Sequence, residues 1–312
     1  MARMAVLVVA AATGVVTAAA GASVAPQRAI TGHVVIVSID GLRPDAIDDA
    51  RTPNLQRLIR EGAYTLEAET VYPSKTLPSH TSMLTGVTPE VHGITWNDDQ
   101  TANHGVVAVP TIFELAREAG LTTAAFFSKA KLRHLEKPGT LDHTQAPTGL
   151  QVLPATQTVE DATRYLRFRR PNLTFIHIAE PDAAGHSFGW MGRAYNVAVR
   201  RADSALGRVV AAADAAFGAG SYLLIVTADH GGSGRDHGSE HADDMQIPWL
   251  AWGAGIEPGE LQVPVRTMDT AATVLWVLGT AVPDGWSGAP VVTAFTPAAQ
   301  LSAGSASRLP AR

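Results

Sequence analysis

The chain has 312 residues, of which 46% are hydrophobic and 17% charged, so it can bury the core of one large α/β domain or, less simply, of two smaller domains. Its formal net charge of -5 argues against a nucleic-acid-binding face and against attachment to anionic membranes, since both need a basic surface. Cysteine is absent, which excludes disulfides, thiolate metal sites and a thiol nucleophile. Any metal ion must therefore be held by His, Asp, Glu or hydroxyl groups.

The N-terminal segment, residues 1–22, has the form of a secretory signal peptide. An early positive charge at Arg3 precedes a run of small and apolar residues, which ends with Ala20 and Ala22 in the small-x-small pattern of a cleavage site. We therefore expect a secreted or periplasmic protein without a stable membrane anchor. The alternative is an N-terminal anchor, but the run is rich in alanine and short of the ~20 strongly apolar residues that a span needs.

The C-terminal segment, residues 296–312, is rich in small residues and has neither a helical nor a strand period. This composition predicts a disordered tail. Between the two ends, residues 30–295 are expected to form the folded, functional domain.

Apolar runs without alternation predict strands that are buried on both faces of a sheet. These runs occupy 33–40, 121–127, 173–178 and 222–228, with 247–253 as a further candidate. Helical patterns lie between or after them, at 52–62, 111–120, 158–170, about 192–217 and 267–279. Strands that alternate with helices predict an α/β fold, a three-layer α/β/α sandwich with a mostly parallel central sheet.

Acidic residues and histidines stand at the ends of three predicted strands. Asp40 ends the first strand, Asp229 and His230 end the fourth, and Asp182 and His186 follow the third within a few residues. Because ligands of open α/β sheets bind beyond the carboxyl ends of the strands, we expect these side chains to meet at one edge. The spacing of four between Asp182 and His186 also puts both on one side of a helical turn.

Each of these acids has an ordinary explanation when it is taken alone. Asp40 precedes a glycine, as in many turns, and Asp182 could cap a helix. The repeated arrangement, with two histidines attached, favours a site for two metal ions with mixed Asp and His ligands. Zinc, manganese and iron all accept such ligands. Two cations would polarise a phosphoryl oxygen and supply the positive charge that an acidic chain otherwise lacks.

A hydroxyl-rich stretch, VYPSKTLPSHTSMLTG at residues 71–86, precedes a predicted helix. It contains Lys75, one of four lysines in the chain, and Thr76. We expect Thr76 to lie just before the helix, with Ser79 as a candidate N-cap. The stretch could serve only to cap the helix. A hydroxyl directed at a dication, however, loses its proton more readily and becomes a good nucleophile.

At these residues the sequence resembles the alkaline phosphatase superfamily and, within it, the nucleotide pyrophosphatase/phosphodiesterase branch. The resemblance runs from about Val34 to Phe295 and so implies an alkaline phosphatase-like catalytic domain. It rests on six motifs in the family's order: IDGLRPD, TPNLQRLIREGA, YPSKTLPSHTSMLTG, PEVHGITWN, EPDAAGH and TADHGG. Any one of them is weak, but six in order are specific.

The resemblance implies a role for each residue that matches a motif. Thr76 matches the threonine nucleophile, which forms a covalent phospho-enzyme and also touches one metal ion. Both ions are normally zinc in the family. The other matched ligands are Asp40, Asp229 and His230 for the ion at the threonine, and Asp182 and His186 for the second ion.

Two further matches concern the phosphate group. Asn97, which closes PEVHGITWN, matches an asparagine that hydrogen-bonds a phosphate oxygen, although it could also be an exposed loop residue. Lys75 precedes the nucleophile as it does in the family. It could help to hold the phosphate, and a solvated lysine is as plausible.

The last histidine ligand departs from the pattern of the larger family members, in which it lies far downstream. This chain has no histidine after His241. Short bacterial relatives have an HG pair a few residues after DHGG, and His237 occupies that place in RDHGSEHADDMQIPW. We favour His237, because the glycine after it lets the backbone swing the ring inward. His241 is the alternative.

The resemblance implies a metal-dependent phosphodiesterase or nucleotide pyrophosphatase that acts on a small phosphate ester or nucleotide through a phospho-threonine intermediate. A phosphomonoesterase or phosphonate hydrolase of the same superfamily is one alternative, and a non-catalytic metal-binding protein is another. Monoester specialists use an added cationic group, for which Lys75 is the only clear candidate. We expect His80 and His92 to be packing or loop residues, and His177 to be a core histidine.

Overall fold

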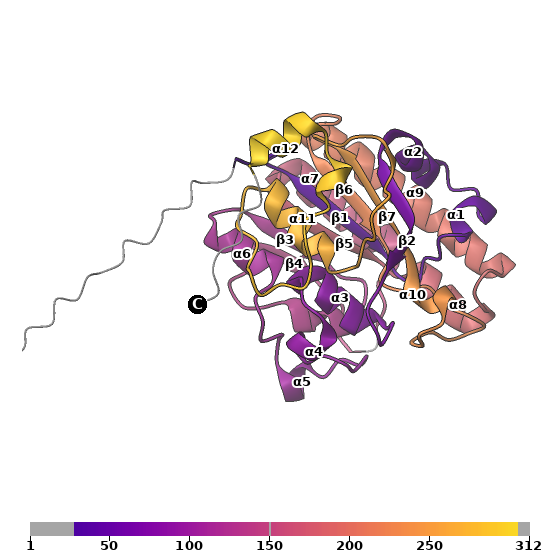
Figure 1. Ribbon diagram of the computed structural model, residues 1–312. Helices are drawn as coiled ribbons and strands as arrows, with labels where there is room; N and C mark the ends of the chain where they lie inside the picture. Colours follow the sequence, from indigo (N-terminus) through magenta and orange to yellow (C-terminus); the bar gives the residue numbers. More distant parts are fainter. Residues whose placement is uncertain (1–27, 150, 305–312) are drawn as a thin grey trace, which may run out of the picture.

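The structure, a computed structural model, describes residues 28–149 and 151–304, and the predicted signal peptide lies outside them (Figure 1). Its centre is an eight-stranded sheet with the order β4-β3-β5-β1-β6-β7-β2-β8. The strands are β1 Val34–Ile39, β2 Ala63–Glu69, β3 Thr123–Phe126, β4 His143–Gln145, β5 Leu173–Ile178, β6 Leu223–Thr227, β7 Gln246–Gly253 and β8 Gly259–Glu260.

The strands β5, β1 and β6 lie next to one another in the middle of the sheet. β1 pairs in parallel with β5 on one side and with β6 on the other, and every residue of these strands is buried. Burial on both faces explains why their sequences show no alternation. β7 runs antiparallel to both β6 and β2. No long helix crosses the sheet between β6 and β7, so the chain returns in the opposite direction. The prediction of a mostly parallel sheet is confirmed.

Helices cover both faces of the sheet, as the three-layer prediction requires. The helices α2, α7 and α8 each contact α9 on one face, and α3, α6 and α11 contact one another on the other. Figure 1 shows α9 behind the sheet and α11 in front of it. The helices are α1 Ala46–Asp49, α2 Pro53–Glu61, α3 Thr76–Thr85, α4 Pro89–His92, α5 Thr101–His104, α6 Ile112–Glu118, α7 Ala155–Arg169, α8 Glu180–Phe188, α9 Arg193–Phe217, α10 Ala242–Met245, α11 Asp269–Val277 and α12 Pro297–Ala303, with 3-10 turns η1 Ala130–Leu135 and η2 Val292–Ala294.

None of the described helices is both long and apolar enough to cross a bilayer. The C-terminal expectation needs a correction, because α12 lies where a disordered tail was predicted. Thr296 Oγ1 caps this helix by accepting the Ala299 N–H, at 3.2 Å, and Pro297 opens it. Ala299 and Ala303 are buried, so packing adds to the helix propensity of alanine. Residues 305–312 lie outside the described part.

Candidate active site

The candidate site lies beyond the carboxyl ends of β1, β5 and β6, where the sequence predicted it. Asp40 follows β1 directly, Asp229 comes two residues after β6, and Asp182 lies in the first turn of α8, which follows β5. The Asp182 N–H donates to the Asp40 carbonyl at 3.0 Å. Gly41 has a φ of 70°, and a Cβ there would approach Asp182 Cα to 3.0 Å. Glycine therefore lets the end of β1 lie against α8.

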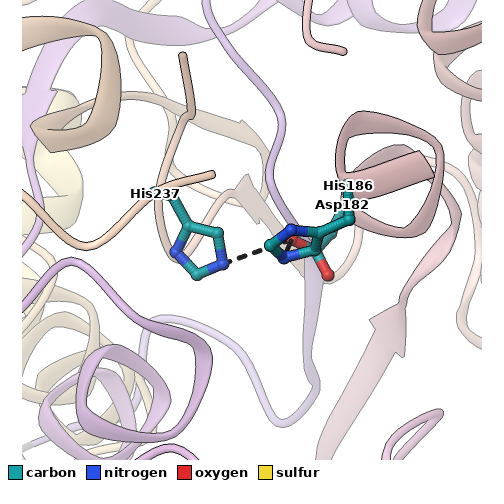
Figure 2. A group of neighbouring side chains, drawn as sticks. All are labelled: Asp182, His186 and His237. Carbon is teal, nitrogen blue, oxygen red and sulfur yellow. Dashed lines mark ion pairs between the residues drawn. The ribbon is translucent and has the colours of Figure 1, made fainter. Parts of the chain in front are cut away.

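One group of possible metal ligands consists of Asp182, His186 and His237, and we call it the outer group (Figure 2). The Nε2 atoms of His186 and His237 lie 3.3 Å and 3.5 Å from Asp182 Oδ1. Their Nδ1 atoms donate to the carbonyls of Arg235 and Ser74, at 3.0 Å and 2.8 Å. Because Nδ1 carries the proton in this arrangement, each Nε2 presents a lone pair to the Asp182 carboxylate side.

The other group consists of Asp40, Asp229 and His230, and we call it the inner group. His230 Nε2 lies 3.4 Å from Asp40 Oδ1 and 3.3 Å from Asp229 Oδ2. It also lies 3.4 Å from the Oγ1 atom of Thr76. His230 Nδ1 donates to the Gly231 carbonyl at 2.8 Å, so Nε2 again faces the group. The three side chains of the inner group are completely buried.

The donor atoms of both groups fit divalent cations. Among the described residues, Asp40 Oδ1, Asp182 Oδ1 and Asp229 Oδ2 are buried atoms without a hydrogen-bond partner. Buried carboxylate oxygens in that state cost free energy unless a cation or donor lies beside them. In each group the donor atoms lie within 4.8 Å of one another, and together they form the O and N set that zinc and similar metals accept. The residues present therefore fit two metal ions.

His237 and His241 differ sharply in position. The His237 side chain is buried and its ring stacks on His230, with centroids 3.6 Å apart and planes at 10°. The His241 side chain is 64% exposed, and its Nδ1 accepts the Asp243 N–H at the start of α10. Gly238 has a φ of 112°, and a Cβ there would lie 2.7 Å from Lys75 Cε. The structure thus brings His237 to the outer group and leaves His241 outside both groups.

Thr76 does not precede the helix α3, as the sequence suggested, but is its first residue. Ser79 is not the N-cap, because its N–H already donates to the Lys75 carbonyl at 3.0 Å inside the helix. Lys75 is the last extended residue, and Thr76 is buried. The expectation failed because the proline that follows Leu77 is compatible with the first turn of a helix. Thr76 therefore projects from a helix N-terminus toward His230.

Asn97 lies beside the start of α3 and is half-buried. Its Oδ1 accepts the Leu77 N–H at 3.0 Å, which fixes the amide and leaves Nδ2 as a donor. Lys75 is also half-buried, and its aliphatic stem lies against Gly238. Both residues that were predicted to meet the phosphate therefore lie beside Thr76. Lys75 precedes it in the chain, and Asn97 contacts Leu77, the residue that follows it.

Two histidines around the inner group were expected to be packing or core residues only. His177 Nε2 donates to Asp40 Oδ2 at 2.9 Å, while its Nδ1 accepts the Ser128 N–H at 3.3 Å. His80 Nδ1 donates to the Thr76 carbonyl at 2.7 Å and lies 3.4 Å from Asp229 Oδ2. Both are fully buried, and burial lowers the pKa of His80 to about 4. They are core residues that also position the inner group.

Sequence reasoning also missed Lys129. This lysine is 8% exposed and lies at the start of η1, just after β3. Its Nζ lies 2.7 Å from Asp40 Oδ2 and also contacts Asp182 Oδ2, so it joins the inner and outer groups. Burial opposes the charge of Lys129, but Asp40 and Asp182 outweigh it and raise the pKa of the ammonium. Its place after a strand that ends at the same edge is the signal that could have found it.

Known proteins share the sequence pattern. The sequence model of the type I phosphodiesterase / nucleotide pyrophosphatase family matches residues 34–247. A venom phosphodiesterase from Macrovipera lebetinus is 27% identical over 240 residues, which cover 69% of this chain and 27% of the relative. A bis(5'-adenosyl)-triphosphatase from Xenopus laevis is 26% identical over 219 residues, which cover 66% and 48%. The chain thus spans from about a quarter to about half the length of these relatives.

Solved structures share the fold. An inactive variant of murine ectonucleotide pyrophosphatase/phosphodiesterase 5, in complex with AMP, superposes with a TM-score of 0.67 at 18% identity, covering 80% of this chain and 95% of that one. A 2-O glycosaminoglycan sulfatase gives 0.66 at 16% identity, covering 85% and 74%. Both likenesses confirm the alkaline phosphatase-like sandwich.

Proposed function

Since this chain belongs to the type I phosphodiesterase/nucleotide pyrophosphatase family, we propose that it hydrolyses phosphate esters with two divalent cations and a phospho-threonine intermediate at Thr76. The observation that carries the proposal is the position of the Thr76 hydroxyl, 3.4 Å from His230 Nε2. A buried hydroxyl beside a set of metal ligands is the arrangement that nucleophilic catalysis needs.

The two groups have separate tasks in this proposal. Bound dications would polarise the phosphoryl group and lower the pKa of the nucleophile's hydroxyl. The inner group, with Thr76, would hold one ion, and the outer group would hold the other. His177 fixes the carboxylate of Asp40, and His80 fixes the carbonyl of Thr76. These contacts keep the nucleophile and its ligands in place before substrate binds.

The reaction proceeds in two displacements. Thr76 Oγ1 forms a bond to phosphorus as the bond to the leaving group breaks, and the leaving oxygen takes up a proton. Water then attacks the phospho-threonine, the bond to Thr76 breaks, and the hydroxyl is restored. The Asn97 amide, held by its contact with the Leu77 N–H, and the Thr76 N–H at the start of α3 would bind the phosphoryl oxygens. Lys75 lies near enough along the chain to assist them.

We propose zinc for both ions, because the donors are carboxylates and imidazoles only, apart from the threonine. The substrate class is a small phosphate diester or nucleotide, supported by relatives named venom phosphodiesterase and bis(5'-adenosyl)-triphosphatase. Export from the cell is proposed from the form of residues 1–22 and from the venom relatives.

The substitution Thr76→Ala tests the mechanism. We expect the kcat on 4-nitrophenyl thymidine 5'-phosphate to fall at least about a thousandfold, as when other enzymes lose their nucleophile. Metal content, measured on the same sample, should stay near two ions per chain because the six carboxylate and imidazole ligands do not depend on Thr76. Turnover at the wild-type rate in this variant would overturn the phospho-threonine mechanism.

A further inference from the structure

Two lysines follow β3 at the edge of the sheet where both ligand groups lie. Lys129 precedes η1 and Lys131 lies within it. The Lys129 ammonium touches one carboxylate of each group, 2.7 Å from Asp40 Oδ2 and in contact with Asp182 Oδ2. A single cation therefore contacts both groups of the candidate site.

A role for Lys129 as a plain counter-ion does not agree with the metal fit. With a dication in each group, the positive charge of the two ions would already exceed the negative charge of the three carboxylates, Asp40, Asp182 and Asp229. An almost fully buried ammonium beside two dications is repelled by both, and burial adds a desolvation cost. An anion bound between the ions and the lysine removes this conflict. The lysine is therefore better explained by the substrate than by the carboxylates.

Lys131 is a second cation, two residues after Lys129 in η1. It is partly buried and forms no ion pair with any residue of 28–149 or 151–304. Burial and the neighbouring Lys129 lower its pKa, while Asp40, Asp182 and Asp229 act on it in the opposite direction. A partly buried ammonium without a partner is available to an anionic ligand.

We propose that Lys129 and Lys131 bind the second negative charge of a dianionic phosphoryl group and give the enzyme an additional activity on phosphate monoesters. A diester has one negative charge at phosphorus, which the two metal ions can neutralise. A monoester has two near neutral pH, and the additional oxygen needs a cation of its own. This inference rests on the proposed phosphoryl transfer at Thr76, and it corrects the expectation that Lys75 is the only candidate cation.

The test uses the metal-loaded full chain and two esters with the same leaving group. 4-Nitrophenyl phosphate is a dianion at pH 8, and 4-nitrophenyl methyl phosphate is a monoanion. We expect Lys131→Gln to lower the ratio of kcat/KM for the monoester over the diester about tenfold, the value of one lost charge contact of ordinary strength. The inhibition constant of inorganic phosphate against diester hydrolysis should rise by a similar factor.

Arg133→Gln is the matched control, because Arg133 lies on the same turn but pairs with Glu136, at 3.6 Å, away from both groups. It should leave the ratio unchanged. If the wild type hydrolyses the diester and Lys131→Gln leaves both the ratio and phosphate inhibition unchanged, the lysine inference is wrong and the proposed function stands. If the wild type hydrolyses neither ester, the proposed function fails and the inference with it.

Discussion

The inner and outer ligand groups are built from the same residue types but in different ways. The inner group comes from two strand ends, its three side chains are fully buried, and His80 and His177 support it from the core. The outer group joins one turn of α8 to a loop rich in glycine, and the His186 side chain is 43% exposed. A group that belongs to the core is set by folding, whereas one that includes a loop depends on that loop's conformation.

The strongest test of this contrast is the loss of a ligand from the loop. His237→Ala should remove one of the two metal ions and lower kcat/KM by on the order of a hundredfold or more, because the outer group keeps only two ligands. Metal analysis and turnover on the same preparation measure both effects. His241→Ala is the control, since that side chain is 64% exposed, and it should change neither quantity. Equal effects of the two variants would show that the loop carries a different ligand.

A smaller effect is expected from the support of the inner group. His177→Phe removes the donor to Asp40 but keeps the ring volume, and we expect metal affinity to fall about 10-fold to 100-fold. His177→Gln retains a donor and should recover part of the affinity, which a merely structural histidine would not require. Competition with a zinc-binding dye measures the affinity. If Phe and Gln bind metal equally well, the contact with Asp40 has no positioning role.

The smallest effect concerns α3, the helix that carries Thr76. His92 is buried, its Nδ1 accepts the Ile94 N–H, and its Nε2 lies 3.0 Å from Ser82 Oγ of α3. Burial lowers the pKa of His92 to about 4, below the value of about 6.5 in an unfolded chain. The neutral ring stabilises the fold above pH 6.5, and this contribution is lost as the pH falls toward 4.

Urea unfolding at pH 7 and pH 5 measures this contribution. The wild type should lose about 2 kcal/mol more unfolding free energy over that interval than His92→Asn, which keeps an acceptor but does not titrate. His104→Asn, on an exposed residue, should behave like the wild type. A wild type and a His92→Asn variant with the same pH dependence would contradict the assignment.

The sequence predicted the parts of the molecule that follow from local pattern. Buried strands could be recognised from their apolar runs, and Asp40, Asp182 and Asp229 from their positions at strand ends. The pairing of β2 with β7 could not be predicted, because it depends on strand order and β2 has a mixed burial pattern. The role of His177 was hidden for a related reason. Its own segment reads as core, and only the register with β1 brings it beside the end of that strand.

The lysines were missed on different grounds. A lysine in a loop is usually solvated, so the position of Lys129 just after a strand did not by itself distinguish it from a solvated residue. The predicted start of α3 was wrong by four residues, with Ser79 expected as the N-cap where the structure has Lys75, because Thr76, Pro78 and Ser79 each suit a helix N-terminus. These errors concern how segments pack against one another, which local pattern does not record.

The stacked rings of His230 and His237 join the inner and outer groups directly, at 3.6 Å between centroids. An ion that fixes His230 would also restrict the ring of His237, and with it the loop between these two residues. The second ion then meets a ligand that has already lost its conformational freedom. The stacking predicts that occupancy of one group alters the metal affinity of the other, by the same factor in both directions.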